Sequence, residues 1–127
     1  MASTVCELPP LVMRMVDPLC RTHKQRIGSG SLLRALSNTP EARSSSEGVV
    51  TIHRSIPQLI RGMGLDNGPT VHATRQRWRN QVFRWVGYLA PLGITAQEAP
   101  RGPDGRGTGI LFRIPAGVAQ SVRAAES

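Results

Sequence analysis

The segment RQRWRNQVFRWVGYL at residues 75–89 most constrains the fold, because its apolar side chains recur with the period of an α-helix. At about 100° per residue, one side of the helix carries an apolar stripe made of Val71, Trp78, Val82, Trp85, Val86 and Leu89. The opposite side carries small and polar residues spaced by threes and fours, namely Ala73, Gln76, Arg77, Asn80 and Arg84. The pattern predicts a helix over 71–90 that buries its indoles and exposes a basic row.

Two shorter elements are expected before this helix. The β-branched stretch VVTIHR at 49–54 is typical of a strand. A helix is expected over 55–63, where Ser55 and Gln58 have the spacing of a capping box. Thr70 can cap the long helix that follows.

A β-hairpin is expected after the long helix. ITAQE at 94–98 and GILFRIP at 109–115 have the composition and alternation of strands. The glycine-rich segment PRGPDGRG at 100–107 would form the tip between them, with Arg101 and Arg106 on either side of the turn.

The 127 residues suffice for one modest core, and we divide them into four parts. Residues 1–37 form an N-terminal helical segment, and 38–48, NTPEARSSSEG, read as a Ser-rich linker. Residues 49–115 hold nearly all of the patterned sequence, and 116–127 are a weak helix or a frayed tail. The N-terminal segment is the candidate contact for a homodimer through its apolar residues Leu11, Met15, Leu19, Leu32, Leu33 and Leu36.

The charge balance indicates a polyanionic partner. The chain contains sixteen Lys and Arg but only eight Asp and Glu, which gives a net charge of +8. Lys24 is the only lysine, so the other fifteen bases are arginines, the side chain that binds phosphate and guanine in bidentate fashion. The polar row of the long helix contains no acid, whereas an ordinary solvated face mixes both signs.

Several classes of protein are not expected. No apolar run approaches the ~20 residues of a membrane span, and the N-terminus does not resemble a signal peptide. Cys6 and Cys20 are expected to be free thiols. The histidines are scattered, and the acids show no catalytic constellation, so we expect no metal, no cofactor and no enzyme activity. The glycine-rich segment lacks the Lys-Ser/Thr of a phosphate-binding loop.

The order of these elements resembles the winged helix-turn-helix DNA-binding family. The resemblance covers residues 49–115: a strand, a short helix, a turn, a long basic helix leaving through GYLAPLGIT, and a hairpin with an Arg/Gly tip. It implies an α+β fold in the order helix, strand, helix, helix, strand, strand. The first helix would come from 9–26 or 31–37, within the extra N-terminal segment.

The resemblance also implies how the residues would be used. Residues 55–63 would form the supporting helix, and helix 71–90 would read bases in the major groove. The 100–107 wing would contact the backbone or minor groove. Arg79, at the flank of the long helix, is suited to a phosphate. The predicted DNA-binding residues are Thr70, Ala73, Gln76, Arg77, Arg79, Asn80, Arg84, Arg101 and Arg106.

We therefore expect a sequence-specific double-stranded DNA-binding protein, most simply a small bacterial, phage or plasmid transcriptional regulator in the cytoplasm, associated with the nucleoid and active as a dimer. A replication, partition or recombination accessory protein of a mobile element is the alternative with the same fold. An adaptor that binds proteins is the alternative from another class, and RNA binding is a lesser variant. Trp78 and Trp85 could stack on unpaired bases, although their position on the apolar stripe favours the core.

Overall fold

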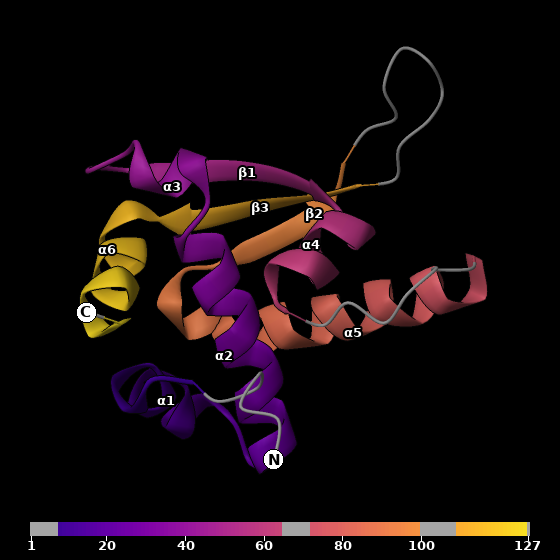
Figure 1. The fold of residues 1–127 in the computed structure, drawn as a ribbon, viewed down its shortest axis with the longest axis horizontal. Coiled ribbons are helices and arrows are strands. Elements are labelled where there is room, and N and C mark those ends of the chain that lie inside the picture. The colour runs from indigo at the N-terminus through magenta and orange to yellow at the C-terminus, as the bar shows by residue number, and fades with distance from the viewer. Residues whose placement is uncertain (1–7, 65–71, 100–108, 127) are drawn as a thin grey trace.

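The computed structural model describes residues 8–64, 72–99 and 109–126, and within them the fold is α+β (Figure 1). The elements follow in the order α1 (Pro10–Val16), a 3₁₀ turn (Asp17–Leu19), α2 (His23–Ser37), α3 (Pro40–Arg43), β1 (Val49–Ser55), α4 (Ile56–Gly62), α5 (His72–Leu89), a second 3₁₀ turn (Ala90–Leu92), β2 (Thr95–Glu98), β3 (Gly109–Pro115) and α6 (Ala116–Glu126).

The three strands form an antiparallel sheet in the order β1-β3-β2. In this register Ile52 of β1 pairs with Phe112 of β3, and both side chains are fully buried. The neighbouring row, in which Thr51, Arg113 and Thr95 pair across the sheet, is exposed. The sheet therefore has one face in the core and one in solvent, as the alternation in β3 predicts.

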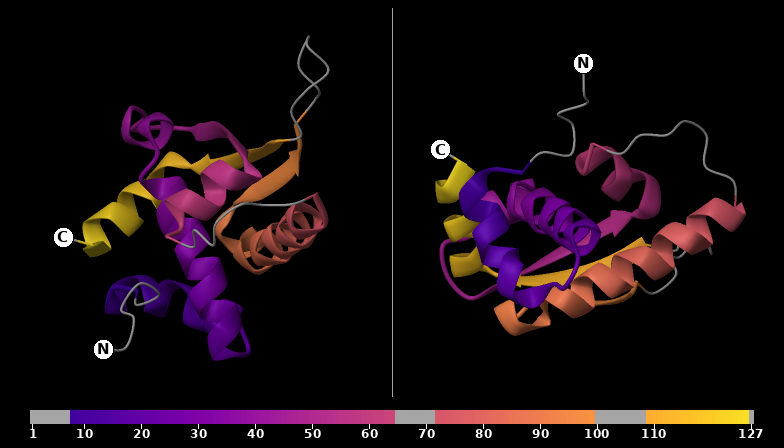
Figure 2. Two further views of the ribbon diagram at one scale, coloured as in Figure 1. Left: turned by 45° about the vertical axis from the view of Figure 1, so that its right-hand side comes forward. Right: turned by 90° about the horizontal axis from the view of Figure 1, so that it is seen from below.

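The helices α2, α4 and α5 lie on the buried side of the sheet, and α6 follows directly from β3 (Figures 1 and 2). Their apolar side chains form one core cluster with the inward side chains of the strands. The capping box expected at the start of α4 is present: Gln58 N–H donates to Ser55 Oγ, and Ser55 N–H donates to Gln58 Oε1. The start of α4 is therefore confirmed.

Residues 38–48, expected to be a linker, instead contain α3. The hydroxyl of Thr39 accepts a hydrogen bond from Ala42 N–H and caps this short helix. Glu41 then accepts two hydrogen bonds from the guanidinium of Arg54 on β1, at 2.6 and 2.8 Å. The hydrogen-bonded guanidinium holds the pKa of Glu41 below its ordinary value. An ion pair and a cap thus hold the Ser-rich segment against the sheet.

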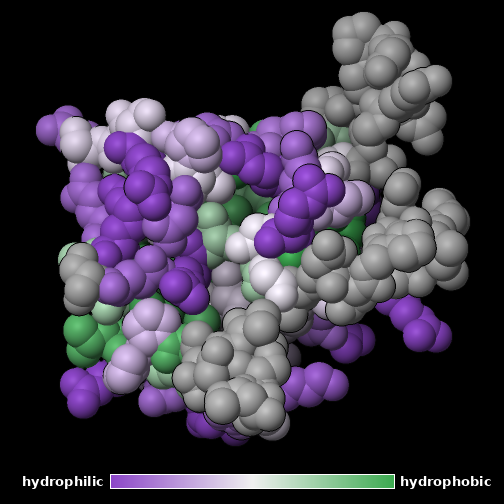
Figure 3. Space-filling model, viewed as in Figure 1, coloured by the Kyte–Doolittle hydropathy of each residue, from purple (hydrophilic) through white to green (hydrophobic). Residues whose placement is uncertain are grey.

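The N-terminal segment contributes to the same core rather than forming a separate apolar surface. Leu32, Leu33 and Leu36 are fully buried on α2, which packs on α6, α5 and α1, so these residues, expected at a dimer contact, are occupied within the chain. Leu11 is 51% exposed on α1. In Figure 3 hydrophobic side chains reach the surface at the lower left, over α1, while most of that face is hydrophilic.

Residues 116–127, expected to be a weak helix or a frayed tail, form α6 as far as Glu126. Ala116, Ala119 and Val122 of this helix are fully buried, and α6 packs on α2. Among the described residues, no helix has both the length and the apolar composition that a membrane crossing requires.

Candidate nucleic-acid interface

The long helix expected over 71–90 is α5, His72–Leu89, and it separates its two faces as expected. On the inner face Val82, Trp85, Val86 and Leu89 are buried. After Leu89 a 3₁₀ turn runs to Gly93, whose φ of 88° is the left-handed conformation that glycine adopts most easily. The predicted helix and its end are therefore confirmed.

The outer face of α5 carries an exposed polar row made of Gln76, Arg77, Asn80 and Arg84, which we call the α5 row. Within it, Gln76 Nε2 donates to Asn80 Oδ1 at 3.3 Å, so the two amides lie one turn apart on the same side. The His72 end of α5 extends past the described ends of the strands (Figures 1 and 2). The row is therefore presented on a helix that is anchored on one side and open on the other.

Arg79, which is expected at the flank of the helix and suited to a phosphate, is largely buried. Only 9% of the residue is exposed, and its Nη1 lies 3.2 Å from a carboxylate oxygen of Glu98 on β2. The position faces Glu98, the last residue of β2, and the guanidinium pairs with its carboxylate. Arg79 connects α5 to the sheet.

The α5 row stays positively charged because the ion pairs of the described residues do not involve its arginines. In the described part of the chain four carboxylates pair with arginines, as Asp17–Arg26, Glu41–Arg54, Glu98–Arg79 and Glu126–Arg34. Residues 72–89 contain no acid. Among the described residues Arg77 and Arg84 have no ion pair. The local positive charge is thus concentrated on the outer side of α5.

The other predicted site residues are placed in part or not at all. Ala73 lies in the first turn of α5. Thr70, Arg101 and Arg106 lie outside the described residues, and with them the cap of α5 and the tip of the predicted wing.

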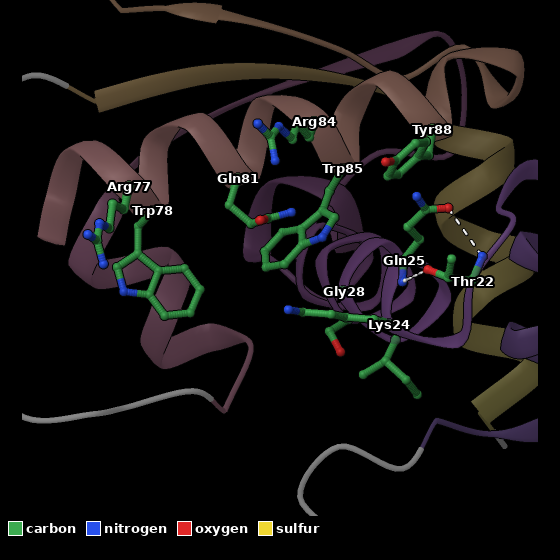
Figure 4. Close-up of a pocket in the computed structure, with 12 residues that line it drawn as sticks. Thr22, Lys24, Gln25, Gly28, Arg77, Trp78, Gln81, Arg84, Trp85 and Tyr88 are labelled. Atoms are coloured by element: carbon green, nitrogen blue, oxygen red, sulfur yellow. Dashed lines mark hydrogen bonds between the residues drawn. The ribbon is translucent and has the colours of Figure 1, made fainter.

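A pocket of about 580 Å³ between α2 and α5 was not predicted from the sequence (Figure 4). Trp78, half-buried, and Trp85, 8% exposed, both face it, and their ring centroids are 6.3 Å apart with the planes inclined by 58°. Trp85 thus belongs to the core as expected, whereas Trp78 borders an opening. The arginines beside these indoles were the only local signal for such a pocket. Its other wall comes from α2, which is too far away in the sequence for a local pattern to reveal.

No metal site is apparent in the ranges that the structure describes, since no three His, Cys, Asp or Glu side chains come together there. Cys20 is a buried free thiol whose Sγ lies 3.2 Å from Ser29 Oγ, and Cys6 lies outside the described residues.

Comparison with known proteins gives no assignment: no protein-family model, curated protein or solved structure matches this chain. A function therefore has to rest on the charge, exposure and shape of α5 and its surroundings.

Proposed function

We propose that this chain binds double-stranded DNA in a sequence-specific manner, with α5 as its recognition helix in a winged-helix fold. The observation that carries the proposal is the α5 row: two amides and two arginines, exposed along one side of a helix without a single carboxylate. An exposed helix face with a general solvating role would include acids. On a face that meets the DNA backbone each carboxylate would be repelled by the phosphates, so the absence of acids favours contact with DNA.

The chemistry of the row fits the major groove. Asn80 and Gln76 carry planar amides of the kind that bond adenine N6 and N7, and Arg77 carries the fork that bonds guanine O6 and N7. Arg84 lies two turns after Gln76 and is suited to the backbone phosphate at the groove edge. The projecting N-terminal half of α5 favours insertion, since a helix fits within the ~12 Å width of the major groove.

The surroundings of α5 support the same reading. The short helix α4 precedes it, and β2 and β3 follow it and complete an antiparallel sheet with β1, which comes before α4. Trp85 and Arg79 anchor the inner side of α5 to α2 and β2. A reading helix has to be rigid, because base contacts tolerate little displacement. The 100–107 wing, the homodimer and the role of a transcriptional regulator remain predictions from the sequence. A replication or partition role would use the same contact with DNA.

The experiment is selection of duplexes from a random pool, followed by titration of the enriched site and of single-base variants of it. We expect an enriched consensus. Asn80→Ala should lose discrimination at one base pair by about 1–3 kcal/mol while keeping weaker general binding. The matched control is Arg14→Ala, an exposed residue on α1, which packs on α2 and α6.

The outcomes separate the proposal from its alternatives. If the selection gave no consensus and all duplexes bound with equal affinity, sequence-specific recognition would be excluded. Preference for a structured RNA over every duplex would move the function to RNA. Equal effects of Asn80→Ala and Arg14→Ala would contradict a role for α5.

A further inference from the structure

The pocket between α2 and α5 combines aromatic and cationic side chains in one enclosure. Its aromatic lining is Trp78, Trp85 and Tyr88, and its cationic lining is Lys24, Arg77 and Arg84. Figure 4 shows the aromatic and arginine side chains coming from α5 and Lys24 coming from α2. At about 580 Å³ it has the size of a pocket for a small organic molecule.

The aromatic wall is fixed by a close contact between the helices. A Cβ atom at Gly28 would overlap the indole of Trp85, so this indole lies directly on the backbone of α2. The indole of Trp78 is inclined to it and is half-buried. A flat ring entering the pocket would meet the aromatic surface of Trp78 and Trp85, an arrangement that favours offset or edge-to-face stacking.

The cations select the charge of the occupant. Lys24 and Arg84 are exposed at the rim, on opposite helices, and within the described residues neither has an ion pair. Thr22 and Gln25, which also line the pocket, form the capping box of α2 with each other's backbone N–H groups, and no acidic residue is among the described residues that line it. The charges available to a ligand are therefore positive.

We propose that this pocket binds a planar aromatic anion, with the ring against Trp78 and Trp85 and the anionic group between Lys24 and Arg84. A free aromatic carboxylate and a nucleotide both carry this chemistry. The pocket shares Arg84 with the α5 row, whereas Lys24 lies on α2 outside that row, so Lys24→Gln tests the pocket separately from DNA binding.

The two tryptophans of the chain provide a direct test, since both line the pocket. Their indole N–H signals are followed in ¹H–¹⁵N spectra of the full chain during titration with 2-naphthoate, its neutral isostere 2-naphthamide, the non-aromatic cyclohexanecarboxylate, and AMP. We expect saturable shifts of both signals with 2-naphthoate and affinity at least about tenfold weaker for 2-naphthamide and cyclohexanecarboxylate. Tighter binding of AMP than of 2-naphthoate would assign the site to a nucleotide.

Variants distinguish the pocket from general attraction to a basic protein. Lys24→Gln and Arg84→Gln should each weaken 2-naphthoate several-fold and keep the dispersed spectrum of a folded chain, whereas Arg14→Gln should leave the affinity unchanged. Indole signals that respond to none of the four compounds would overturn the proposal. Equal affinity for 2-naphthoate and 2-naphthamide, or equal losses in Arg84→Gln and Arg14→Gln, would do the same.

Discussion

The indole of Trp85 on α5 rests on the backbone of Gly28 on α2, where even a methyl group would overlap it. This contact sets how closely the two helices approach, and both residues line the pocket between them. The same inner side of α5 includes Val82 and Leu89, which are buried in the common core. The orientation of the α5 row thus depends on a glycine that lies far from it in the sequence, on α2.

Gly28→Ala should therefore destabilise the protein. The added methyl group has no space unless the indole or α2 moves, so we expect a loss of about 1–3 kcal/mol in the free energy of unfolding. Urea denaturation measures the loss, and tryptophan emission should shift to longer wavelength as Trp85 becomes hydrated.

Gly87→Ala is the matched control for that substitution. Gly87 lies within α5, is exposed, and a Cβ there would meet no atom within 4 Å. Because alanine favours helix, this variant should be more stable by about 0.5–1 kcal/mol. Equal stability of the two variants would contradict the close contact between Gly28 and Trp85.

Arg79 should matter for stability more than its partner Glu98. The side chain of Arg79 is 10% exposed and that of Glu98 is 72% exposed. Arg79→Ala removes a buried aliphatic stem together with the ion pair, and we expect a cost of about 1–2 kcal/mol. Glu98→Gln removes only a solvated charge and should cost less than about 1 kcal/mol.

A third variant distinguishes the contribution of the aliphatic stem of Arg79 to stability from that of its charge. Arg79→Met keeps an unbranched apolar chain and should recover part of the loss seen with Arg79→Ala in the same denaturation assay. If Arg79→Met and Glu98→Gln instead cost as much as Arg79→Ala, the ion pair and not packing would hold α5 to β2.

The Glu41–Arg54 pair predicts a pH dependence of stability. The pKa of Glu41 is lowered by its hydrogen bonds to Arg54 from an ordinary value of about 4.5. A lowered pKa in the folded state stabilises the fold above the unfolded-state pKa, and this stabilisation disappears as pH falls through the folded-state pKa. Glu41→Gln should thus cost up to about 1 kcal/mol at neutral pH, and the difference from the parent should shrink below about pH 4.5.

Glu47→Gln controls for the removal of one negative charge from the same region. Glu47 is exposed and has no ion pair in the part of the chain that the structure describes. Chemical denaturation between neutral and acid pH should show no such change for this variant. A difference between Glu41→Gln and the parent that stays constant through the acid range would contradict the ion-pair account.

The elements predicted from the sequence are those with local signals. The capping box of Ser55 and Gln58 marks the start of α4, and the period of the apolar residues marks α5. Thr39 followed by Pro40 is also a local signal for a helix start, but the serines after it pointed to a linker. What holds α3 in place, the bond from Arg54 to Glu41, could not be read from the segment itself.

Features that depend on tertiary contacts between elements were not predicted from the sequence. Arg77 and Arg79 stand on either side of Trp78 in the sequence, and Arg79 is buried against Glu98 of β2 whereas Arg77 is exposed. Leu32 on α2 looked available for a second chain, because nothing local shows that the helices packed on α2 bury it. The pocket likewise required α2 and α5 to be neighbours.

The most direct test of duplex recognition by α5 is the salt dependence of DNA affinity, measured by fluorescence anisotropy on one labelled duplex for the parent, Arg84→Gln and Arg14→Gln. Each phosphate contact contributes about 0.9 to the slope of log affinity against log salt. We expect Arg84→Gln to bind more weakly with a slope smaller by about 0.9, and Arg14→Gln to match the parent. Parallel lines for all three proteins, or no binding by the parent at low salt, would contradict the account.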